Sequence, residues 1–116
     1  MRRRVITVPI DKEAEKALDY DAAKPAQLIE RYLSGEEYVF LETMGLISLI
    51  NSEGDSNIDD FEDDSVTGLE NLNRVLQALQ QREEDLQTHQ YYPVLQELIS
   101  LFAEAIRRGT GVYFFF

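Results

Sequence analysis

The last six residues, GVYFFF (111–116), decide how the two ends of this chain fold. Left exposed, four aromatic residues and a valine would form an apolar patch of the kind that folded proteins avoid. Because valine and aromatic residues favour strands, we expect this run to be a buried strand. The segment RRRVITVPI (2–10) is a second candidate strand, since residues 5–8 are all β-branched. We therefore expect the two terminal strands to pair, with the arginines at 2–4 and 107–108 near one edge.

Short helical segments are expected after the first strand. Asp11 can cap a helix over residues 12–20, and Pro25 can begin helical turns over 24–35, so that the two segments form one broken element. Residues 38–50 are ambiguous: their apolar residues recur at spacings of three and four, but they also divide into two paired strands around a glycine. We favour a helix there.

Two longer helices are expected in the second half of the chain. Residues 65–87 carry a leucine stripe with Ser65 or Thr67 as the cap, and residues 91–109 have a proline near their start and Gly109 at their end. The leucine stripe can be core or the seam of a homodimer. We predict a single α+β domain over residues 1–116, mainly α, with about four helices. Its N- and C-terminal strands pair in a small antiparallel or mixed sheet.

Composition indicates a folded, cytoplasmic domain. The chain has 116 residues, of which 44% are hydrophobic and none is cysteine, which excludes a disulfide framework and a thiol nucleophile. The basic N-terminus lacks the apolar segment of a signal peptide, and no apolar run approaches the roughly 20 residues that a membrane-spanning helix needs.

Charge is the strongest compositional signal. Twenty-two acidic residues against eleven basic ones give a formal net charge of −11, and no Lys or Arg lies between Arg31 and Arg74. This balance opposes direct binding to nucleic acid or to anionic membranes, because both depend on basic side chains. It favours a basic protein partner, attracted at long range.

The stretch NSEGDSNIDDFEDDSVTG (51–68) concentrates this charge, and we expect an acidic loop at about 52–65. Two apolar residues lie among the acids, an arrangement that suits apolar anchors with a charged rim. The alternative is a solvated linker whose repulsion is screened by salt. The candidate partner-binding residues are Glu53, Asp55, Ile58, Asp59, Asp60, Phe61, Glu62, Asp63 and Asp64.

Metal and catalytic motifs are incomplete. DSNIDDFEDDSV matches a calcium loop at its first, third and fifth positions, but Asp60 stands where the turn needs glycine and Val66 where the loop needs glutamate. His89, the only histidine, follows Asp85 by four residues, and no further metal ligands accompany the pair. We expect no metal, no cofactor and no catalytic residue, and hence not an enzyme.

A small, cysteine-free, strongly acidic domain whose helical layout ends in RRGTGVYFFF (107–116) resembles the small acidic bacterial immunity proteins of contact-dependent inhibition and polymorphic toxin systems. The resemblance implies a non-catalytic inhibitor that neutralises a basic toxin, such as a nuclease, through its acidic surface. It lies in size, charge and layout, so no functional residue is carried over. One alternative is a nucleic-acid mimic or antitoxin-like regulator of a DNA-binding protein. A second alternative is a divalent-cation-responsive module, which millimolar calcium would stabilise.

Overall fold

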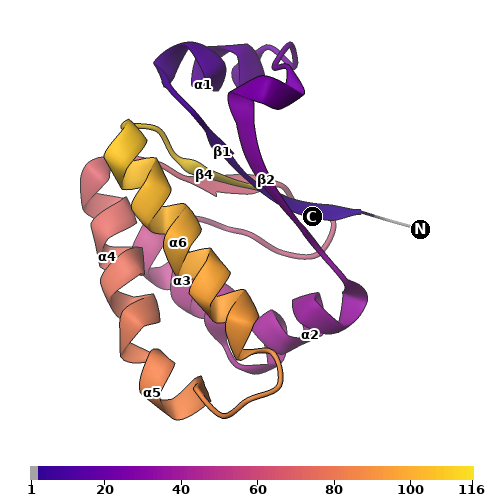
Figure 1. Ribbon diagram of the computed structural model, residues 1–116, viewed down its shortest axis with the longest axis vertical. Coiled ribbons are helices and arrows are strands. Elements are labelled where there is room, and N and C mark those ends of the chain that lie inside the picture. Colours follow the sequence, from indigo (N-terminus) through magenta and orange to yellow (C-terminus); the bar gives the residue numbers. More distant parts are fainter. Residues whose placement is uncertain (1–2) are drawn as a thin grey trace.

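The computed structural model describes residues 3–116, which form six helices, one 3-10 turn and four short strands (Figure 1). In chain order the elements are β1 (Arg4–Pro9), α1 (Lys12–Asp19), the 3-10 turn η1 (Pro25–Gln27), β2 (Leu28–Leu33), α2 (Gly35–Thr43), α3 (Leu46–Gly54), β3 (Asp64–Val66), α4 (Leu69–Gln81), α5 (Glu83–Leu86), α6 (Tyr92–Arg108) and β4 (Val112–Phe115).

The four strands form one antiparallel sheet in the order β2-β1-β4-β3. The terminal strands pair at its centre, with Val5 opposite Phe115 and Thr7 opposite Tyr113. The predicted α+β class, dominated by helix and with paired terminal strands, is therefore confirmed. The sheet is antiparallel throughout and larger than the two expected strands, because β2 and β3 add to its edges.

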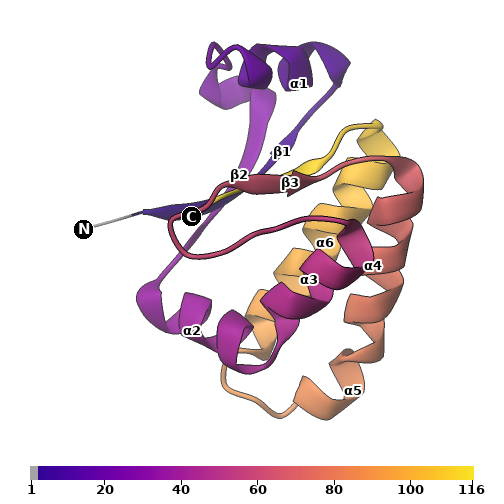
Figure 2. The same ribbon diagram turned by 180° about the vertical axis from the view of Figure 1, so that it is seen from behind.

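The aromatic C-terminus supplies the centre of the core. Side chains alternate along a strand, so Ile6 and Phe114 point to one face of the sheet, where α3, α4 and α6 pack (Figures 1 and 2). Phe114 and Phe116 are fully buried, with ring centroids 5.6 Å apart, and Tyr38 approaches Phe116 edge-on at 5.4 Å. Such aromatic pairs add about 0.5–1.5 kcal/mol beyond the area that they bury.

The basic residues at the two ends of the chain do not share one edge. Arg4 begins β1, whereas Arg108 is the last residue of α6 and its Nη1 donates to the Ile10 carbonyl beyond the other end of β1, at 3.3 Å. Antiparallel pairing is the reason, since it sets the start of β4, and the helix end that precedes it, beside the end of β1. Arg2 lies outside the described residues.

The predicted helical turns over residues 24–35 are mostly a strand. Pro25 begins only the single turn η1, and β2 then pairs along its whole length with β1, from Arg4 opposite Leu33 to Pro9 opposite Leu28. The residues of β2 include good helix formers, and for this reason the local sequence predicted helical turns. Pairing with β1 overrides this propensity, because β1 would otherwise leave one row of backbone groups unpaired.

The helix prediction for residues 38–50 is confirmed, although two helices share the segment. Ser34 caps α2 reciprocally: its hydroxyl accepts from the Glu37 amide at 3.1 Å, and the Glu37 carboxylate accepts from the Ser34 amide at 2.8 Å. Gly45 separates α2 from α3 with a φ of 74°, in the left-handed region that glycine adopts without strain. Because α3 continues to Gly54, the acidic loop is shorter than expected and spans residues 55–63.

The predicted helix over residues 65–87 starts later and is broken. Ser65 lies in β3, neither suggested residue caps the helix, and α4 begins after Gly68 without a side-chain cap. Arg82 separates α4 from the single turn of α5. Most of the leucine stripe packs into the core against α3 and α6, with only Leu69 largely exposed at 62%.

The last helix is α6, as predicted. It ends at Gly109, whose φ of 70° lets its amide and that of Thr110 bond back to the final turn. Within residues 3–116, no helix is both long enough and apolar enough to cross a membrane.

Candidate functional site

The acidic loop leaves α3, runs out to the C-terminal end of β4 and turns back into β3 (Figure 2). Asp55 closes α3 in the left-handed conformation, with a φ of 54°, which Asp tolerates better than most residues. Asp59 and Glu62 form an isolated antiparallel bridge, so that residues 60–61 make the tip of the loop. The loop is thus an ordered turn at the rim of the sheet.

Asn51 organises the first half of this loop. Its Oδ1 accepts from the Ile58 amide at 2.7 Å and from the Ser56 hydroxyl at 2.9 Å, and its Nδ2 donates to the Ile58 carbonyl at 2.8 Å. Both backbone groups of Ile58 are therefore satisfied by one side chain. These bonds turn the Ile58 side chain inward, where it is only 2% exposed.

The expectation that Ile58 anchors a partner is corrected by this burial. Exposing an apolar side chain to water is unfavourable, and the hydrophobic core beside α3 offers Ile58 a site away from water. Ile58 belongs to the core and fixes the loop from beneath.

The tip of the loop is tied to the ends of the terminal strands. Arg4 Nη2 donates to Asp60 Oδ1 at 2.8 Å, and the Arg4 guanidinium stacks on the Tyr38 ring at 4.1 Å. Asp63 Oδ1 accepts from the Phe116 amide at 2.9 Å, while the Phe116 carbonyl accepts from the Phe61 amide at 3.3 Å. Asp60 and Asp63 therefore hold the loop in place.

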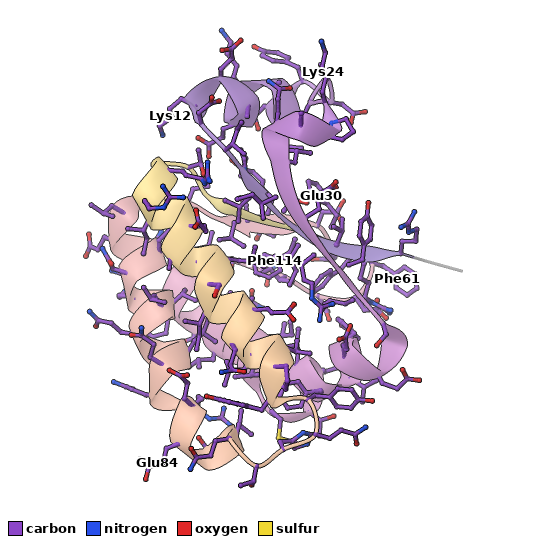
Figure 3. All side chains as sticks on the ribbon, viewed as in Figure 1. Lys12, Lys24, Glu30, Phe61, Glu84 and Phe114 are labelled. Atoms are coloured by element: carbon purple, nitrogen blue, oxygen red, sulfur yellow. The ribbon has the colours of Figure 1, made fainter. Side chains whose placement is uncertain are left out.

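Phe61 remains outward at this anchored tip. Its side chain is 73% exposed, and Figure 3 shows it at the rim while Phe114 lies between sheet and helices. Its φ of 65° is unusual for a bulky residue and persists where the surrounding contacts over-determine the backbone. The contacts of Asp60, Asp63 and Phe116 provide that constraint.

A polar groove of about 380 Å³ opens between α2, α3 and the loop, and we call it the acidic groove. Of its three acidic residues, Glu42 comes from α2 and Asp59 and Glu62 come from the acidic loop. No Lys or Arg is among its lining residues in the described part of the chain. It is lined by Glu42, Ile47, Ser48, Asn51, Asn57, Ile58, Asp59 and Glu62.

The groove has a negative electrostatic environment. Tyr38 donates to Glu42 Oε2 at 3.3 Å. Burial, followed by the negative charges of Glu42 and Asp60, raises the pKa of Tyr38 to about 12.

The nine candidate residues therefore divide by role. Asp59 and Glu62 lie in the acidic groove beside Glu42, and we call these three residues together with the adjoining Phe61 the acidic face. Asp64 joins Asp60 and Asp63 in holding the fold, because its carboxylate accepts from the Asn57 amide at 2.6 Å and the Ser65 amide at 2.8 Å. The remaining candidates are Asp55, which is exposed, and Glu53, which is half-buried.

Sequence reasoning missed Asn51, Arg4 and the part played by Glu42. A signal for Asn51 does exist, since Asn near a helix end commonly bonds to nearby backbone groups. Arg4 and Glu42 carry no comparable local signal, because the chain brings them to the loop only through the sheet and the α2–α3 turn.

His89 and Asp85 do not form a shared site. Arg82 pairs with Asp85 at 3.2 Å, while the His89 ring packs on Phe40 at 4.7 Å and its Nδ1 accepts from the Tyr91 amide at 3.0 Å. Throughout residues 3–116, no group of three or more Asp, Glu or His side chains is placed to hold a metal ion.

No protein-family model, curated protein or solved structure matches this chain.

Proposed function

We propose that this chain is a non-catalytic binding protein whose acidic face holds a basic protein partner. The observation that carries the proposal is the construction of the acidic loop. Contacts from Asn51, Arg4 and Phe116 hold it from the side of the sheet and of α3, while Asp59, Phe61 and Glu62 stay exposed. A loop that is already ordered loses little conformational entropy when it binds.

The face combines two features of protein-binding surfaces. Acidic side chains speed the encounter with a basic partner, by 10- to 1,000-fold where the field is strong. The exposed ring of Phe61 supplies an apolar anchor of the type that carries binding energy when it enters a pocket. The acidic side chains would determine how fast the partner associates, and the Phe61 ring would determine how long the partner stays bound.

The partner class that fits best is a basic toxin domain, such as a nuclease, with this chain acting as its immunity protein. A toxin that acts on nucleic acid needs a basic surface to hold phosphates. An acidic protein that covers this surface would exclude the substrate. The net charge of −11 and the absence of Lys and Arg between Arg31 and Arg74 support this assignment.

Affinity capture from the native host with matched baits tests the proposal. The baits are the wild type, the double variant Asp59→Lys/Glu62→Lys, and the control Glu13→Lys/Glu84→Lys. The control makes the same change in net charge at exposed acids away from the loop. We expect one stoichiometric basic protein to be retained by the wild type and the control, released by a salt gradient, and lost from the loop variant.

Two results would contradict the proposal: no basic protein is retained, or the loop variant retains it as well as the control does. Association rates of the purified pair at low salt then quantify the effect, with an expected slowing of roughly 10- to 1,000-fold for the loop variant. A captured nuclease or other toxin supports the immunity function, whereas a DNA-binding regulator supports the nucleic-acid mimic.

A further inference from the structure

A second groove, of about 590 Å³, lies along α2 and is mainly apolar. Glu42 of α2 lines the acidic groove, whereas residues on an adjoining face of the same helix line this second groove. We call it the α2 groove. It is lined by Gly35, Glu36, Val39, Phe40, Thr43, Met44, His89 and Tyr91.

The floor of the α2 groove is a fixed aromatic cluster. Phe40 is buried, and its ring lies 4.7 Å from that of His89 and 5.9 Å from that of Tyr91. The hydrogen bond from the Tyr91 amide to His89 Nδ1 orients the His89 ring within the turn before α6, and the ring contacts with Phe40 hold this turn against α2. Met44, at one end, adds a flexible side chain that can adapt to an apolar guest.

Val39 forms the exposed wall of the groove. It is 55% exposed in the middle of α2, a place where a helix that faced only water would carry a polar residue. A volume of about 590 Å³ lies within the range of sites that bind a largely apolar guest. The groove can therefore take an apolar group from outside without rearrangement of its floor.

The charges around the groove favour a basic guest. Glu36 and Glu42 are exposed one turn before and one turn after Val39. The arginines that reach this region are engaged: Arg31 with Glu37 and Glu97, and Arg82 with Asp85 and the Met44 carbonyl. Beyond the start of α2, the Arg3 guanidinium stacks on Tyr32 at 4.2 Å.

We propose that the α2 groove binds the apolar face of a basic amphipathic helix on a partner protein. Recognition of an amphipathic helix by an apolar groove is a recurrent mode of binding, in which residues one turn apart act as anchors. Here an apolar side chain of the helix enters beside Val39, and its lysine or arginine residues face Glu36 and Glu42. The inference shares with the proposed function the basic character of the partner and the residue Glu42, which lines the acidic groove and lies one turn after Val39.

Synthetic helical peptides test this inference on the intact protein by NMR. One peptide has a leucine face and a lysine face, a second replaces the lysines by glutamates, and a third replaces the leucines by serines. We expect only the first to shift the signals of Val39, Met44 and Tyr91. Absence of those shifts at millimolar peptide, or equal shifts with the glutamate peptide, overturns the inference.

Matched variants locate the contact. Val39→Ser should weaken binding of the first peptide at least tenfold, while Leu69→Ser, which alters an equally exposed apolar residue at the start of α4, should leave it unchanged. Val39→Ala should also weaken binding. Because alanine favours helix, a loss of affinity in this variant is not caused by unfolding of α2. Equal affinities for the wild type, Val39→Ser and Leu69→Ser would place the peptide elsewhere.

The outcomes are separable from those of the proposed function. If Asp59→Lys/Glu62→Lys keeps the captured partner but Val39→Ser loses the peptide, the acidic-face proposal fails and the α2 groove stands. If Val39→Ser binds the first peptide as tightly as the wild type does, the groove inference fails, whatever the result of the affinity capture. Val39 signals that shift with protein concentration alone would indicate a second copy of this chain in the groove, and would also overturn the inference.

Discussion

Asn51 shows how one side chain sets the form of the acidic loop. It satisfies both backbone groups of Ile58 and accepts from Ser56, so the loop begins with its apolar residue already buried. Without these bonds the Ile58 amide and carbonyl would need other partners while their side chain stays in the core. The outward position of Asp59 and Glu62 therefore depends on a residue outside the acidic face.

We expect Asn51→Ala to destabilise the fold by about 1–3 kcal/mol, because buried backbone groups lose their hydrogen bonds. Urea denaturation measures the change, and amide exchange at Ile58 should become faster. The control is Asn73→Ala, an exposed position on α4, where a change within about 0.5 kcal/mol is expected. Equal stability of the two variants would show that Asn51 does not hold the loop.

Glu37 links the stability of α2 to pH. Hydrogen bonds from Arg31, aided by that from the Ser34 amide, outweigh burial and lower the pKa of the Glu37 carboxyl. Since its pKa in the folded state lies below the unfolded value of about 4.3, its contribution is complete above that pH. The contribution is lost as the pH falls through the folded-state pKa.

We expect Glu37→Gln to lower stability by about 1–3 kcal/mol at neutral pH, since hydrogen bonds to a charged group are lost. Urea midpoints of the wild type and the variant should converge as the pH is lowered below about 4. Glu36→Gln, an exposed neighbour, should show a much smaller difference throughout. A gap between wild type and Glu37→Gln that persists in acid would contradict this account.

Among the elements, α3 packs closely against its neighbours at its C-terminal end. Its last residue, Gly54, lies against Val66 of β3 and Val75 of α4, so that a Cβ built there would be 2.8 Å from a Val66 methyl and 3.0 Å from a Val75 methyl. The close approach lets the chain leave α3 and return as β3 over the same core. The position of the acidic loop thus depends on packing between elements as well as on its own contacts.

We expect Gly54→Ala to cost about 1–3 kcal/mol through overpacking, although alanine favours helix. Gly35→Ala is the matched control, because no atom lies within 4 Å of the added Cβ and the residue also belongs to a helix. Thermal or urea denaturation compares the two variants. A stabilising effect of Gly54→Ala would show that Val66 and Val75 can move aside at little cost.

Charged residues are distributed unevenly along the chain. All three lysines lie in residues 12–24, and Figure 3 shows Lys12 and Lys24 with α1 at the end of the molecule away from Phe61. Eleven acidic residues and no basic one lie between Arg31 and Arg74. Such an arrangement orients the molecule toward a basic surface, and it also makes the acidic flank repel itself.

We expect the melting temperature to rise between about 10 mM and 150 mM salt, as the screening length falls from about 30 Å to about 8 Å. Glu62→Lys should raise the melting temperature at low salt and reduce this salt dependence, because it relieves repulsion within the acidic face. Glu13→Lys makes the same change in net charge beside Lys12 and Lys16 and should give no such gain. Identical curves for the two variants would show that only the total charge matters.

The sequence by itself determined the features that depend on local chemistry. β-branched residues at the start and aromatic residues at the end predicted two strands. The spacing of apolar residues predicted α6 and favoured helix over residues 38–50, and the counts of charged residues predicted an acidic flank. In each of these cases the physical preference belongs to a residue and its near neighbours. That is why a single sequence is enough to find them.

Only the tertiary structure decided the features that depend on distant partners. Pairing with β1 made a strand of residues 28–33, Asn51 and the core took Ile58 away from the surface, and Glu42 joined Asp59 and Glu62 through the turn at Gly45. The α2 groove likewise exists because the turn before α6 folds back onto α2. Burial and proximity arise between segments far apart in the chain, and their energies outweigh local propensity when the two disagree.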